Sequence, residues 1–168
     1  MAKLVIFGGL CVLAVLVGAL STQDRRCLFT GALIILGDWL LFSMWWIYAP
    51  ASLPYVAKGA GLHLTHLDAW AMIDLCAMVC LIGVCWRVWW GPLLWMPLLT
   101  NLVMYAVAYS FHLDYSCYQN GLDAMLSLQL ATVFLVGGPG CADRVSHCWR
   151  LYRGMLGVPI PHRTERNA

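Results

Sequence analysis

Five long runs of apolar residues, separated by short polar segments, dominate the amino-acid sequence. They cover residues 4–22, 27–49, 67–87, 92–111 and 122–138. Each run is close to the roughly 20 mostly apolar residues that a helix needs to cross a hydrocarbon layer of about 30 Å. The pattern therefore predicts an all-α fold, a polytopic integral membrane helical bundle of about five transmembrane helices.

The first run also has features of a secretory signal peptide, because Lys3 precedes an apolar stretch near the N-terminus. That stretch is longer than the roughly 7 to 15 residues of the usual apolar region in such peptides. We therefore expect residues 4–22 to be retained as a helix. If this first segment does not cross the membrane, four transmembrane helices remain.

The chain becomes polar and basic after Pro139. We expect residues 1–138 to form the transmembrane bundle and residues 139–168 to form a basic, amphipathic cytoplasmic tail. Arg144, Arg150 and Arg153 alternate with aliphatic and aromatic residues there, which is typical of a segment that lies on anionic lipid headgroups. A simpler alternative is a basic tail that only fixes the topology.

The distribution of positive charge predicts the orientation of the bundle, because lysine and arginine in short loops stay on the cytoplasmic side. With the N-terminus outside, the cytoplasmic segments hold all eight arginines and the outer segments hold only Lys3 and Lys58. This favours an outer N-terminus and a cytoplasmic C-terminus, as in a bacterial inner membrane. The positive charge at the N-terminus opposes this arrangement, so a first helix that enters from the cytoplasm stays an alternative.

Composition supports the membrane interpretation. Of the 168 residues, 62% are apolar and 11% are charged, and the mean hydropathy is +0.76, whereas soluble domains carry about 25% charged residues. A net charge of +2 disfavours binding to nucleic acid through a broad basic surface. Tryptophan and tyrosine residues, among them Trp86, Trp89 and Trp90, gather near the predicted helix ends, which predicts an aromatic belt at the lipid headgroups.

Polar side chains occur inside the last four apolar runs, and each needs a partner or a function there because burial in lipid is unfavourable. They are Asp38, Asp74, Asn101 and Gln129. No lysine or arginine lies at the depth of the two aspartates, so we expect them to share a proton or to accept bonds from the two amides. A proton or cation relay is one interpretation, and hydrogen bonding that fixes the helix packing is the simpler one.

Histidine and acidic residues gather where the third run begins and where the fourth run ends, on the predicted outer face. This outer histidine cluster comprises His63, His66, Asp68, His112, Asp114 and Cys117. Imidazole, carboxylate and thiolate groups are ligands for zinc and copper, so a divalent metal is the candidate cofactor. Alternatively, the histidines form hydrogen bonds at the interface and the aspartates cap helices, with no metal.

The sequence has no phosphate-binding glycine loop, nucleophile elbow or zinc-protease motif, so we expect no catalysis by this chain alone. Our first hypothesis is a non-catalytic integral membrane subunit that packs against and stabilises a larger membrane protein assembly. Its partners would be bound lipid and other membrane subunits, or further copies of the chain. The alternatives are a metal-binding membrane enzyme or redox subunit, and a small proton-coupled transporter or pore that uses Asp38 and Asp74.

Overall fold

The computed structural model describes residues 2–60, 66–111 and 116–155, with most side chains of residues 3–44, 69–107 and 121–155. The described residues form helices joined by short turns, without a strand, which confirms the all-helical prediction. The helices are α1 (Ala2–Leu20), α2 (Arg25–Ala60), α3 (His66–Cys85), α4 (Pro92–Phe111) and α5 (Ser116–Met155).

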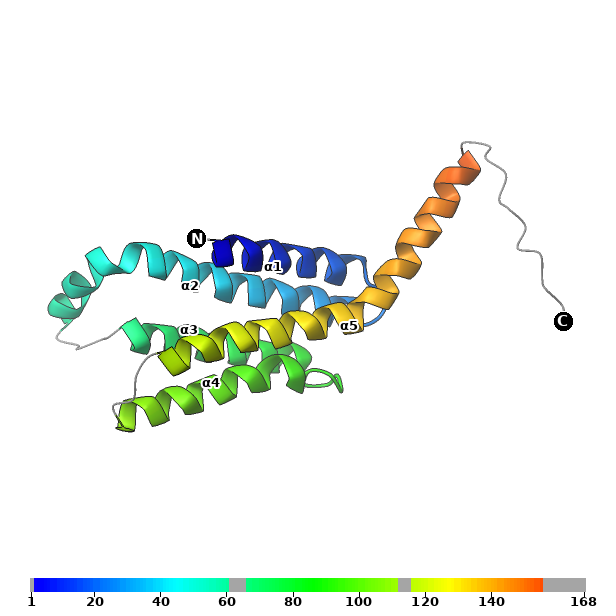
Figure 1. Ribbon diagram of the computed structural model, residues 1–168. Helices are drawn as coiled ribbons and strands as arrows, with labels where there is room; N and C mark the ends of the chain where they lie inside the picture. The colour runs from blue at the N-terminus through cyan, green and yellow to red at the C-terminus, as the bar shows by residue number, and fades with distance from the viewer. Residues whose placement is uncertain (1, 61–65, 112–115, 156–168) are drawn as a thin grey trace.

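Successive helices lie side by side and run in opposite directions (Figure 1). Each helix contacts the next one along the chain, and α1 also contacts α5, so the bundle closes on itself. The start of α1 therefore lies at the same end of the bundle as the starts of α3 and α5 (Figure 1). The α1–α2 loop and the α3–α4 turn lie at the opposite end.

Three helices agree closely with the apolar runs of the sequence. α1, α3 and α4 begin and end within two residues of the predicted ranges. α2 is different, because it continues to Ala60, whereas the sequence prediction ended it at residue 49, before Pro50. A proline removes one helical hydrogen bond and bends the axis, but the helix can continue beyond it.

The last helix is also longer than predicted. α5 begins at Ser116, passes through Pro139 and ends at Met155, whereas the sequence prediction covered only residues 122–138. The part after Pro139 leaves the bundle at an angle (Figure 1), and we call residues 141–155 the α5 extension. The segment predicted to be a separate tail is thus helical and continuous with the bundle as far as Met155.

The length and composition of the helices support part of the predicted membrane topology. Among the described residues, three helices are long and apolar enough to cross a membrane, over Lys3–Leu20, Arg25–Met44 and Gly121–Arg153. The apolar stretches of α3 and α4, Ala69–Cys85 and Pro92–Val107, are shorter.

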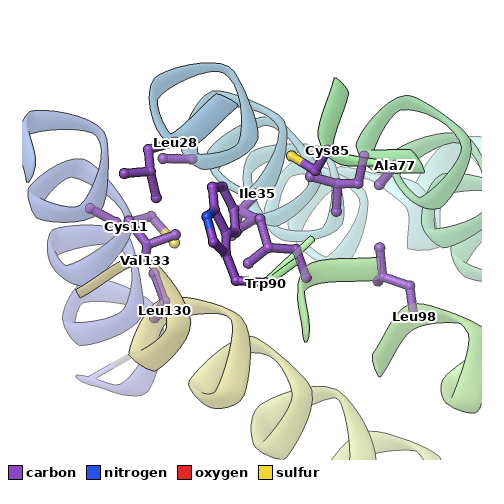
Figure 2. Packing of buried hydrophobic residues seen from close by; sticks show 13 residues of the cluster. Cys11, Leu28, Ile35, Ala77, Cys85, Trp90, Leu98, Leu130 and Val133 are labelled. Carbon is purple, nitrogen blue, oxygen red and sulfur yellow. The ribbon is translucent and has the colours of Figure 1, made fainter. Parts of the chain in front are cut away.

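Trp90, from the turn between α3 and α4, lies at the centre of the apolar core. Its ring is fully buried among side chains that include Leu28 of α2 and Val133 of α5 (Figure 2). Its indole Nε1 donates a hydrogen bond of 3.2 Å to Asp24 Oδ2. The aromatic-belt prediction is therefore wrong for Trp90, whereas the nearby Trp86 and Trp89 are exposed. A ring at a predicted helix end can turn inward when the adjoining turn folds over the core.

α1 and α2 approach each other closely at Gly18. A Cβ atom at this position would lie 2.9 Å from backbone atoms of Leu28 and Phe29, a distance at which one helix would have to move.

The side chains of Cys27 and Cys85 join α2 to the end of α3. Cys27 Sγ donates to the Val84 carbonyl at 3.6 Å, and Cys85 Sγ donates to the Cys27 carbonyl at 3.9 Å. Close backbone contacts of this kind fix the relative depth of neighbouring helices.

Candidate functional site

Four polar side chains that the sequence singles out lie on four different helices of the bundle. Asp74 on α3, Asn101 on α4 and Gln129 on α5 are buried, with exposed fractions of 3%, 0% and 2%. Asp38 on α2 is partly buried. Each lies within an otherwise apolar helix. Its hydrogen-bond partners therefore show whether it stabilises the helix packing or is available for another function.

Asp74 and Asn101 form a direct bond between α3 and α4. Asn101 Nδ2 donates to Asp74 Oδ2 at 2.6 Å, and the bond is buried. A donor-to-acceptor distance of 2.6 Å is at the short end for a hydrogen bond from an amide nitrogen to an oxygen. The Asp74–Asn101 pair is therefore a structural link between the two helices.

Gln129 links α5 to α4 through the backbone. Its Nε2 donates to the Leu94 carbonyl at 2.7 Å, and this bond is also buried. A carbonyl oxygen has two lone pairs, so it can accept this bond in addition to a helical one. Asp74, Asn101 and Gln129 therefore form hydrogen bonds between neighbouring helices, as expected if they fix the helix packing.

Asp38 differs from Asp74, Asn101 and Gln129 in that no hydrogen bond to a neighbouring helix is found for it among the described residues. Its Oδ1 atom is buried, and the described part of the chain gives it no hydrogen-bond partner. A buried acceptor without a partner destabilises a fold by about 1–3 kcal/mol, and more when it is charged. Asn101 Oδ1 is also buried without a partner, but the Asn101 amide bonds to Asp74, whereas no hydrogen bond among the described residues accounts for the burial of Asp38.

Asp38 faces a pocket inside the bundle, with a volume of about 80 Å³. Asp74 and Gln129 also line this pocket, so three of the four polar residues meet there. The rest of the wall is mostly apolar, and α1, α2, α3, α4 and α5 all contribute to it. Its lining residues are Lys3, Leu4, Phe7, Asp38, Trp39, Phe42, Asp74, Leu98, Leu122, Asp123, Met125, Leu126 and Gln129.

Lys3 and Asp123 form an ion pair at one end of this pocket. Lys3 Nζ lies 3.2 Å from Asp123 Oδ2, and both side chains are largely open to the surroundings. Exposed pairs contribute little to stability, about 0–1 kcal/mol. Their position matters more, because the pair joins the first turn of α1 to α5 next to the pocket.

The outer histidine cluster is only partly within the described chain. His63, His112 and Asp114 lie outside the described residues, and the side chains of His66, Asp68 and Cys117 are not described either. Among the side chains that are described, no three His, Cys, Asp or Glu residues form a group that could hold a metal ion. A metal at the outer histidine cluster therefore stays a prediction from the sequence.

The three arginines predicted to lie on lipid are all on the α5 extension. The Arg153 guanidinium lies 5.1 Å from the centre of the Trp149 ring, and that ring stacks on Tyr152 at 5.8 Å between centroids. Arg144 lines an apolar groove with Val145, Cys148, Trp149 and Tyr152, and Leu20 closes the groove from the end of α1. Arg150 is exposed.

Sequence reasoning did not find every residue around the pocket. It assigned Asp123, Trp39 and Phe42 to no binding site. The similar depth of Lys3 and Asp123 follows from the predicted alternation of helices, but their contact requires α1 to lie beside α5. The alternation of helix directions does not by itself predict that α1 and α5 are neighbours.

No family model matches the chain, and no curated protein or solved structure matches it either.

Proposed function

We propose that the chain is an integral membrane protein whose five helices cross the bilayer, with the N-terminus outside and the C-terminus in the cytoplasm. Large apolar side chains on the outside of the helices support this, among them Val5 at 75% exposure and Leu135 at 77%. Soluble monomers do not expose apolar surface so extensively. In a membrane, lipid tails cover such surface and keep it away from water. The arginines at the α1–α2 loop, the α3–α4 turn and the α5 extension support the orientation.

Within the membrane, we propose a non-catalytic subunit that packs through α3 against another membrane protein. The observation that carries this proposal is that Cys76, Cys80 and Gly83 are exposed on one face of α3, beside the larger exposed side chains of Met72 and Val79. These three small residues are spaced four and three apart, so they lie on one side of the helix. A Cβ atom added at Gly83 would meet nothing within 4 Å.

Small residues on a helix face allow another helix to approach closely, and close packing drives helix association in lipid. A leucine or isoleucine at these positions would keep the backbones of the two helices further apart. The face of α3 therefore suits an apolar transmembrane helix, either of a different subunit or of a second copy of this chain.

The test replaces Gly83 with leucine and extracts the full chain from its native membrane in a mild detergent. We expect the unmodified chain to elute with a partner, and Gly83→Leu to elute alone, because the added side chain blocks close approach. Gly9→Leu is the matched control, since Gly9 is also exposed and has nothing within 4 Å. A single chain in both samples, or loss of the partner in both variants, would contradict the proposal.

A second candidate function is a proton-coupled transporter or pore that uses Asp38 and Asp74. The observation that favours it is that both carboxyl groups line the same pocket, where a proton could pass between them. In liposomes loaded with the purified chain, Asp38→Asn and Asp74→Asn should each abolish proton flux while the helical content stays the same. Undiminished flux in both variants would exclude these residues from such a path.

A further inference from the structure

We propose that the pocket inside the bundle binds a small organic cation, whose ammonium group lies between the Asp38 carboxylate and the rings of Trp39 and Phe42. This proposal goes beyond packing through α3 and does not depend on it. It rests on the charges, the aromatic side chains and the size of the pocket.

Among the carboxyl groups of the pocket, Asp38 has a buried oxygen for which no described residue supplies a partner. Lys3 forms its ion pair with Asp123, and Asp74 accepts the bond from Asn101. Asp38 Oδ1 is buried and has no hydrogen-bond donor among the described residues. Because a buried charge is unfavourable unless it is paired, a bound cation would supply what Asp38 lacks.

The aromatic wall of the pocket favours an organic cation over a bare metal ion. Phe7, Trp39 and Phe42 line it together with aliphatic side chains. Aromatic faces attract ammonium groups, and cages of such rings are a recurring way to bind them. A metal ion, by contrast, needs several oxygen ligands around it, and hydrocarbon supplies none.

Two of these rings also contact neighbouring helices. A Cβ atom at Gly8 would lie 2.5 Å from the Trp39 ring, so this ring packs directly on the backbone of α1. The Phe42 ring lies 5.0 Å from that of Trp70 on α3, measured between centroids. Rings that are already positioned lose little conformational entropy when a ligand binds.

The volume of the pocket limits the ligand to a small group. A buried water needs about 10–15 Å³ of such volume, so a pocket of about 80 Å³ has room for a group of about five heavy atoms. A methylated ammonium group is of this size. The exposed Lys3–Asp123 pair at one end of the pocket marks the side from which such a ligand would arrive.

The test uses tetramethylammonium chloride as the probe and isothermal titration of the full chain in lipid nanodiscs, without a proton gradient. We expect saturable binding that weakens roughly tenfold or more in Asp38→Asn, because the charge attraction is lost. Trp39→Leu should weaken binding as well. Asp143→Asn is the matched control, since Asp143 is exposed on the α5 extension, outside the pocket.

Sodium chloride at the same ionic strength and neutral tert-butanol separate charge from size. Neither should compete with tetramethylammonium if both the ammonium charge and the aromatic wall are needed. Should Asp38→Asn lose its helical content, Trp39→Leu and Phe42→Leu still test the pocket. The proposal would be overturned by absence of saturable binding, by equal binding to Asp38→Asn, or by equal competition from sodium. This holds whatever the result of the Gly83→Leu experiment on α3.

Discussion

At the scale of single residues, the four polar groups inside the helices divide by their hydrogen bonds. Asn101 and Gln129 donate to neighbouring helices at 2.6 and 2.7 Å, although Asn101 Oδ1 is buried without a partner among the described residues. Asp38 Oδ1 has no such partner among the described side chains. The sequence predicts that all four lie inside the bundle, but it cannot tell them apart, because hydrogen-bond partners depend on how each helix is rotated about its axis.

Asn101→Ala should lower the free energy of unfolding, because it removes the buried bond to Asp74. Interhelical hydrogen bonds in membranes contribute about 0.6 kcal/mol on average and about 1.7 kcal/mol at most. We expect a loss of about 1–2 kcal/mol, near the upper end, since the bond is buried and a buried acceptor loses this donor. Titration with a denaturing detergent in mixed micelles measures it.

Thr100→Ala is the control for this substitution. Thr100 is exposed and its hydroxyl donates within α4, to the Met96 carbonyl at 3.0 Å, so no contact between helices is lost. We expect a change below about 0.5 kcal/mol, as for most surface substitutions. Equal losses in the two variants would mean that the Asp74–Asn101 bond adds nothing to stability.

At the scale of helices, the apolar pattern predicts where a helix exists better than where it ends. α1, α3 and α4 end near charged or turn-forming residues, and their bounds agree with the sequence. α2 and α5 continue where a proline suggested an end, at Pro50 and Pro139. Each proline removes one helical hydrogen bond and bends the axis, whereas the helical residues on both sides favour continuation, and α2 continues past Pro54 as well.

Gly18→Val should destabilise the α1–α2 contact, because the new side chain would collide with the backbone at Leu28 and Phe29. Overpacking of this kind typically lowers stability by about 1–3 kcal/mol. Gly9→Val is the control on the same helix, where nothing lies within 4 Å. The same detergent titration compares the two, and a Gly18→Val variant as stable as Gly9→Val would show that α1 and α2 are not held at this distance.

At the scale of the whole molecule, the positive charges and the helix arrangement make one prediction about orientation. The α5 extension carries arginines and an exposed thiol at Cys148, and it begins at the same end of the bundle as the α1–α2 loop (Figure 1). If that end is cytoplasmic, a reagent that cannot cross the membrane reaches this thiol only from the cytoplasmic side.

A membrane-impermeant maleimide should therefore label the α5 extension in inverted vesicles and not in right-side-out vesicles. Mass spectrometry of the labelled chain assigns the modified cysteine. Cys148→Ser should remove the label at this position, which controls for reaction elsewhere. Labelling of Cys148 in right-side-out vesicles alone would reverse the proposed orientation.

The ion pair between Lys3 and Asp123 joins residues that are 120 positions apart, and this has a consequence for synthesis of the chain. α1 leaves the ribosome first and can pair with α2 at once, but its contact with α5 has to wait until nearly the whole bundle has been made. Until then, the pocket lacks the wall that Leu122, Asp123 and Gln129 provide. Closure of the pocket is thus the last step in assembling the bundle, and a chain that stops before α5 would leave Asp38 exposed on that side.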